Sequence, residues 1–153
     1  MRRRQTAPQR WLIVRGPDDR DGLAAARRLP RGSGALLLKP LPRHEIRRLR
    51  LRGLNLVREE AGSAIRVHNV RELRRALLTG TPLIFLSPIY PTASHPEWEP
   101  IPRPRAAALA RLAGRRLVAL GGMNEKRFRR VRRLGFNAWA GVGAWLKFTN
   151  VTR

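Results

Sequence analysis

The chain has 153 residues, of which 42% are apolar, so it is long enough to form one domain with a packed core. It contains no cysteine and no run of 18 apolar residues, which argues against disulfides, thiolate chemistry and a membrane span. The formal net charge of +23 attracts polyanions, so nucleic acid is weighed below as a partner.

Residues 1–10 are basic, and we interpret them as an N-terminal tail. No apolar stretch of the kind found in secretory signals follows them. We therefore expect a cytoplasmic protein in which residues 11–153 form a single domain.

Short apolar runs alternate along the chain with arginine-rich segments of helical period. The runs predict strands at 11–15, 34–39, 54–59, 64–69, 82–87, 116–122 and 138–145. The helical segments are 22–29, 43–53, 70–80, 104–114 and 125–135. Strands that alternate with helices indicate an α/β fold, and the nearly continuous apolar strands fit a parallel sheet buried on both faces.

Small and polar residues follow the predicted strands at their carboxyl ends, where ligands bind in parallel α/β folds. They are Ser87, Thr92, Gly121, Gly122, Gly141 and Gly143. Glycine also ends strands and admits tight turns, so one pair of glycines is weak evidence. Two glycine-rich ends after the last two strands are better evidence, because phosphate groups bind at that position in eight-stranded β/α barrels.

Four of these strand ends resemble one family in their order and spacing. They read "VHNVREL", "SPIYPTASHP", "VALGGMN" and "WAGVGAW", within residues 64–146. They are similar to the C-terminal half of the superfamily of thiamine-phosphate synthase and the TenI-type thiazole tautomerase. The resemblance implies a TIM-type (β/α)8 barrel that acts in thiamine biosynthesis and binds a phosphorylated thiazole.

The resemblance also implies roles for individual residues. The phosphate would be held by Thr92 and Ser94 of the hydroxyl loop and by the glycine-rich ends, namely Gly121, Gly122, Val142 and Gly143. His68 stands where the tautomerase branch has an acid/base histidine. A strand-end histidine bonded to backbone is the alternative interpretation of His68.

The sequence departs from the synthase pattern at the residues that handle the diphosphate and the metal. His95 stands where the synthase loop has lysine, and a mostly neutral imidazole is a weaker diphosphate partner. Lys39 remains from the second-strand pattern, so Lys39 and His95 are candidate substrate contacts. There is no aspartate after Asp21, and we predict no metal site; magnesium would be required only if synthase activity is retained.

The predicted barrel is shortened. A full barrel of this type needs roughly 200 residues or more, and only seven strands are predicted here. The strands at 54–59 and 64–69 begin ten residues apart, whereas a parallel crossover needs about a dozen connecting residues. Either the barrel is incomplete at this point, or one of the two strands lies outside the sheet.

Three functions follow, in this order. The first is a thiazole-phosphate-binding protein in which proton transfer by His68 is better supported than metal-dependent pyrimidine transfer, which favours an enzyme. The second is a non-catalytic relative that binds a phosphate ligand or a protein partner. The third is a basic nucleic-acid-binding protein, although the arginines are spread over every predicted helix without one stripe of aromatic stacking partners. The oligomeric state is left open.

Overall fold

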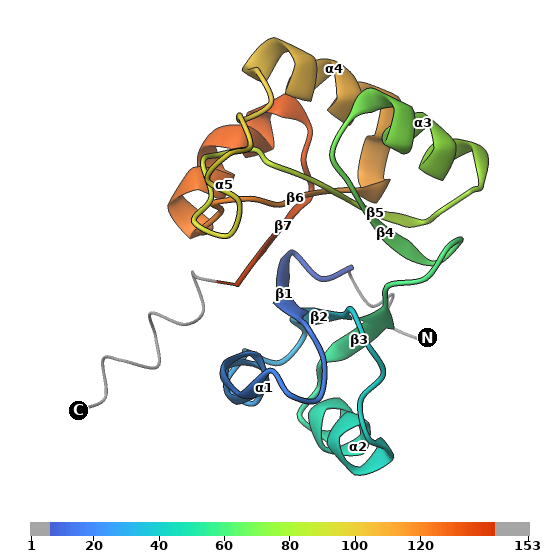
Figure 1. The fold of residues 1–153 in the computed structure, drawn as a ribbon, viewed down its shortest axis with the longest axis vertical. Coiled ribbons are helices and arrows are strands. Elements are labelled where there is room, and N and C mark those ends of the chain that lie inside the picture. The colour runs from blue at the N-terminus through green and yellow to red at the C-terminus, as the bar shows by residue number, and fades with distance from the viewer. Residues whose placement is uncertain (1–6, 143–153) are drawn as a thin grey trace, which may run out of the picture.

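The computed structural model describes residues 7–142 and contains seven parallel strands that curl into a nearly closed barrel (Figure 1). The strands are β1 Arg10–Val14, β2 Gly34–Leu37, β3 Asn55–Arg58, β4 Ala64–Val67, β5 Leu83–Leu86, β6 Leu117–Ala119 and β7 Ala138–Gly141. Their order in the sheet is β3-β2-β1-β7-β6-β5-β4. The predicted α/β barrel of about seven strands is confirmed. β1 begins at Arg10, so the last residue of the expected N-terminal tail belongs to the sheet.

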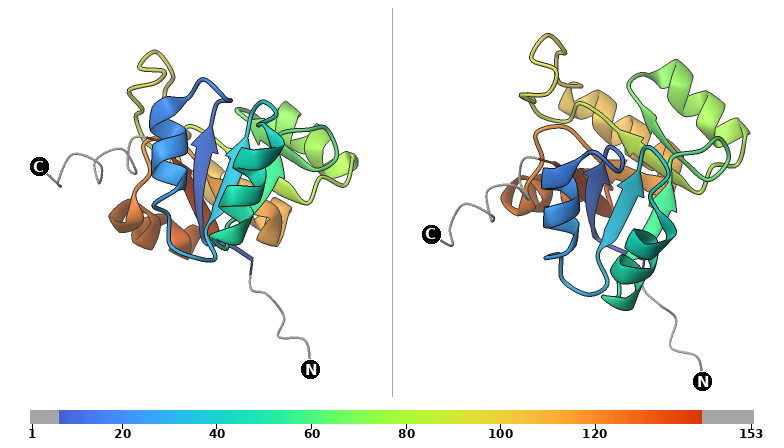
Figure 2. Two further views of the ribbon diagram at one scale, coloured as in Figure 1. Left: turned by 90° about the horizontal axis from the view of Figure 1, so that it is seen from below. Right: turned by 60° about the horizontal axis from the view of Figure 1, so that its bottom comes forward.

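Five helices lie outside the strands and match the five predicted helical segments. They are α1 Arg20–Ala26, α2 Arg43–Leu51, α3 Val70–Leu78, α4 Arg103–Ala113 and α5 Glu125–Val131, with 3-10 turns η1 Gly114–Arg116 and η2 Arg132–Leu134. Helices α1 and α2 flank β1 to β3, and α3 to α5 flank β4 to β7 (Figures 1 and 2). None of the helices within residues 7–142 is long and apolar enough to cross a membrane.

The interior of the barrel is filled by apolar side chains from all seven strands. Trp11 of β1 meets Phe85 of β5 edge to face, with ring centroids 5.6 Å apart. Gly34 of β2 leaves the room that the Trp11 ring occupies, because a Cβ atom there would overlap it. The interior is therefore a packed core, and a ligand has to bind at an end of the barrel.

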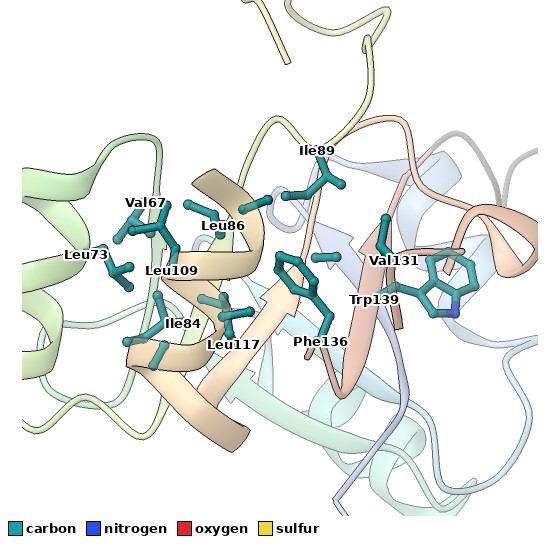
Figure 3. Close-up of a cluster of buried hydrophobic side chains, with 14 of the residues drawn as sticks. Val67, Leu73, Ile84, Leu86, Ile89, Leu109, Leu117, Val131, Phe136 and Trp139 are labelled. Carbon is teal, nitrogen blue, oxygen red and sulfur yellow. The ribbon is translucent and has the colours of Figure 1, made fainter. Parts of the chain in front are cut away.

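Two further apolar clusters lie between the strands and the helices. One joins the outer faces of β4 to β7 to helices α3, α4 and α5, and includes Leu73, Leu109 and Phe136 (Figure 3). The other joins β1 to β3 to helices α1 and α2, and includes Leu12 and Leu49. Each part of the sheet thus packs against its own helices.

The barrel has a seam between β3 and β4. These neighbours along the chain are both in the sheet, but they are not paired with each other as strands. A tight turn links them, closed by a single antiparallel bridge between Glu60 and Ala64. The Glu59 carboxylate accepts hydrogen bonds from Arg66 Nε at 2.7 Å and from the Arg66 backbone N–H at 3.3 Å. Of the two alternatives raised by the short connection, the structure shows the incomplete barrel.

The ladder between β1 and β7 joins the first strand to the last. Beside it, Arg10 donates two hydrogen bonds to the Glu125 carboxylate at 2.9 and 3.0 Å, and Trp139 Nε1 donates a third at 3.1 Å. The hydrogen bonds from Arg10 are the main reason why the pKa of Glu125 lies below its usual range. Glu125 is therefore a fixed anion at neutral pH.

Candidate functional site

The carboxyl ends of the strands surround a cavity of about 1510 Å³. It is larger than the 300–1,000 Å³ typical of small-molecule sites, because residues of the α1 region, Ala25 and Leu29 among them, also line it. The lining includes most of the residues that the sequence singled out, namely His68, Thr92, Ser94, His95, Gly121, Gly122 and Val142. Lys39 is exposed and does not line the cavity, and Gly143 lies outside the described residues.

The two glycines after β6 bring two loops into contact. Gly121 has φ +98°, and a Cβ atom there would lie 2.7 Å from Pro88 Cα. Gly122 has φ +59°, and a Cβ atom there would overlap the Pro91 carbonyl oxygen. The loop after β5 is also bonded to this segment, because Tyr90 N–H donates to the Gly121 carbonyl at 3.1 Å. The glycines thus have a packing role that the sequence reasoning did not foresee.

Three hydroxyl groups follow β5 and reach the cavity. Thr92 Oγ1 accepts a long hydrogen bond of 3.4 Å from the backbone N–H of Ser94, which makes a turn at the tip of the loop. Ser87 is only 4% exposed, and its hydroxyl group forms no hydrogen bond with any atom of residues 7–142. A buried hydroxyl with free bonding capacity at a cavity wall is suited to a polar ligand atom.

His68 is held at the end of β4 by Glu72. Its backbone N–H donates to Glu72 Oε2 at 3.0 Å, and its ring Nδ1 lies 3.3 Å from the same oxygen. Asn69 caps α3 by accepting from the Glu72 N–H at 2.8 Å, so the predicted cap is present. The carboxylate reaches the N–H of His68, one residue before the cap residue. This contact favours an Nδ1–H tautomer, which leaves Nε2 of the half-buried ring to accept a proton.

Trp98 lies between the two histidines of the site. The His95 ring stacks on the indole with centroids 3.8 Å apart and planes 9° from parallel. The His68 ring meets the same indole edge to face at 4.6 Å. Trp98 also lines the cavity, so it fastens the loop after β5 to the end of β4.

Arg127 is a second residue that the sequence reasoning did not select. Asn124 caps α5 through the Arg127 N–H at 2.8 Å, which sets the start of this helix beside the glycines. The Arg127 guanidinium donates to the Gly122 carbonyl at 2.6 Å and lies 4.6 Å from the centre of the Tyr90 ring. The cap at Asn124 was the one sequence signal for its place; nothing in the sequence indicated the role of Trp98.

The donor groups of the site do not fit a magnesium ion. Within residues 7–142 no three histidine or acidic side chains come together as a ligand set. Glu59 and Glu125 are each engaged by an arginine, Arg66 and Arg10 respectively. Magnesium prefers carboxylate oxygens that are free to bind it, and none is available at this mouth.

Two comparisons with known proteins match this chain. The model of a family described as thiamine monophosphate synthase matches residues 57–145. Among solved structures, the chain is similar to thiamine phosphate pyrophosphorylase from Bacteroides thetaiotaomicron, at 16% sequence identity and a TM-score of 0.55. That likeness covers 95% of this chain and 88% of the other, and at this identity it shows the fold alone. No curated protein matches the chain.

Proposed function

Because the chain belongs to the thiamine monophosphate synthase family, we propose that the mouth of its barrel binds a phosphorylated thiazole-type ligand in the cytoplasm. The observation that carries the proposal is the meeting of Thr92, Ser94 and Gly122 at one cavity. Two hydroxyl groups donate hydrogen bonds to phosphate oxygens, and such bonds to a charged acceptor are stronger than neutral ones.

Backbone donors support the same assignment. The N–H groups of Gly122 and Met123 donate to no atom in the part of the chain that the structure describes. Both residues line the cavity together with Lys126 and Arg127. Free N–H groups beside cationic side chains make an environment that favours an anion.

If the protein is an enzyme, proton transfer by His68 is the chemistry that its residues support. Glu72 holds Nδ1, and Nε2 then acts as the group that takes a proton from the ligand and returns it. Metal-dependent pyrimidine transfer has no comparable support, because the carboxylates near the mouth are paired with arginines. A non-catalytic relative would bind the same phosphate ligand and lack this step.

Nucleic-acid binding is the second candidate, and the net charge of +23 favours it. The two functions differ in their response to salt. Binding to RNA or DNA through phosphate contacts weakens by orders of magnitude as salt rises, whereas a small ligand held in a cavity depends much less on salt.

Isothermal titration calorimetry with thiazole phosphate at physiological salt tests the proposal. We expect saturable binding to one site, with equal affinity in a chelator and in magnesium. Loss of binding in the chelator would reveal a metal site and contradict the ligand assignment made here. Absence of binding in both buffers, together with salt-sensitive RNA or DNA binding, would favour the second candidate.

A further inference from the structure

The loop that carries Thr92 and Ser94 brings no fixed cation to the phosphate. His95 is its one basic side chain, and that ring is stacked on Trp98 while its Nδ1 lies 3.4 Å from Glu97 Oε1. A phosphate monoester carries close to two negative charges at neutral pH, and a site that binds it well pairs it with a positioned cation. That cation has to come from another element of the mouth.

Arg127 of α5 has the geometry for this role. Its guanidinium is fixed from two sides, by the Gly122 carbonyl at 2.6 Å and by the Tyr90 ring at 4.6 Å. No carboxylate of residues 7–142 forms an ion pair with it. The one hydrogen bond to Gly122 occupies a single donor of the five that a guanidinium has, so the others are available to a ligand.

The position of Arg127 also matches that of the hydroxyl loop. Tyr90 comes two residues before Thr92, and the guanidinium that lies against its ring lines the same cavity as Thr92 and Ser94. The glycines after β6 hold the two segments together, since Gly122 is in contact range of both Tyr90 and Arg127. A ligand phosphate between the two segments would meet hydroxyl groups on one side and the guanidinium on the other.

We propose that Arg127 is the cationic phosphate-binding residue of this site and sets its selectivity for a phosphate monoester over the corresponding alcohol. The inference rests on the proposed function, since it concerns the same ligand. Arginine suits the role because its planar fork can donate two parallel hydrogen bonds to phosphate oxygens while the rest of the group stays on the Tyr90 ring. Lysine would supply the charge without the fork.

The test compares variants of Arg127 with a charge-matched control on the same helix. Arg130→Ala removes one exposed positive charge from α5, and Arg130 does not line the cavity. Calorimetric titrations with thiazole phosphate and with its dephosphorylated alcohol are run on each protein at constant salt. Thermal melts establish that each variant is folded, and Arg127→Lys provides a second, milder change should Arg127→Ala not fold.

We expect Arg127→Ala to weaken thiazole-phosphate binding by about ten- to a hundredfold and to leave binding of the alcohol unchanged. Arg127→Lys should lose part of this affinity, and Arg130→Ala should stay within about twofold of the unmodified protein. If Arg127→Ala or Arg127→Lys keeps the full preference for the phosphate ester, the role of Arg127 is wrong and the proposed function still stands. If the unmodified protein fails to bind thiazole phosphate, the proposed function fails and this inference fails with it.

Discussion

Replacing Gly121 with alanine tests whether the loop after β5 depends on contact with the glycines after β6. An alanine Cβ would lie 2.7 Å from Pro88 Cα and 3.2 Å from the Ile89 backbone nitrogen. Ordinary carbon contacts are about 3.5–4.0 Å, so the Pro88 segment has to move by roughly 1 Å. Overpacking of this kind costs about 1–3 kcal/mol. The positive φ of Gly121 adds about 1–3 kcal/mol for any residue with a side chain.

Gly32→Ala separates the two contributions. Gly32 has φ +89°, close to the +98° of Gly121, but no atom lies within 4 Å of a Cβ atom built there. Both variants therefore carry the backbone cost, and only Gly121→Ala carries the collision with Pro88.

Urea unfolding of the two variants and the unmodified protein gives the free energies of unfolding. We expect Gly121→Ala to be less stable than Gly32→Ala by about 1–3 kcal/mol. In thermal melts this corresponds to roughly 2–12 °C for a chain of this size. Equal loss of stability in the two variants would refute the claim that contact with the loop is what requires glycine at position 121.

Three further predictions concern the site and its surroundings. The double change Thr92→Ala with Ser94→Ala should weaken thiazole-phosphate binding at least about tenfold in calorimetry while moving the melting temperature little; unchanged affinity would contradict the phosphate assignment. His68→Ala should leave ligand affinity near that of the unmodified protein and abolish any proton-transfer activity, which proton exchange on the thiazole followed by NMR would detect; undiminished exchange would exclude His68 as the acid/base. Because the folded-state pKa of Glu125 is depressed by the hydrogen bonds from Arg10, its stabilising effect is complete above the unfolded value of 4.5 and is lost as the pH falls through the lower folded value. Urea unfolding at pH 7 and in this acidic range should therefore show a smaller acid-induced loss of stability for Glu125→Gln than for the unmodified protein, and equal losses would contradict this role.

The arrangement of strands and helices could be predicted from the sequence because apolar runs and helical periods are local signals. Leu36 and Leu86, for example, lie in runs that are buried on both sides, as expected for a parallel sheet. Parallel strands place their carboxyl ends at one edge, so the meeting of Thr92 with Gly122 at one cavity also followed. The short link after β3 indicated that a β/α unit is absent, but only the structure shows that both flanking strands remain in the sheet.

The side chains that complete the site depend on the path of the loops, which local patterns do not specify. Trp98 contacts His68 from thirty residues further along the chain, and no periodicity connects the two. Arg127 looks like one of many exposed arginines until the fold brings it against Tyr90. Lys39 fits the family pattern in sequence, but its side chain packs against Gly16 at the end of β1 and stays exposed.

The seam has a consequence for how the barrel folds. With β3 and β4 unpaired, the β1–β7 ladder is the only strand pairing between the two halves, β1 to β3 and β4 to β7, among the described residues. That ladder joins strands from opposite ends of the chain, so its closure carries the largest loop entropy of any pairing in the sheet. Each half has its own helices and outer cluster and can collapse early, whereas the ladder forms last. In native-state hydrogen exchange, the amides of the β1–β7 ladder should accordingly open together and ahead of the strands within each half.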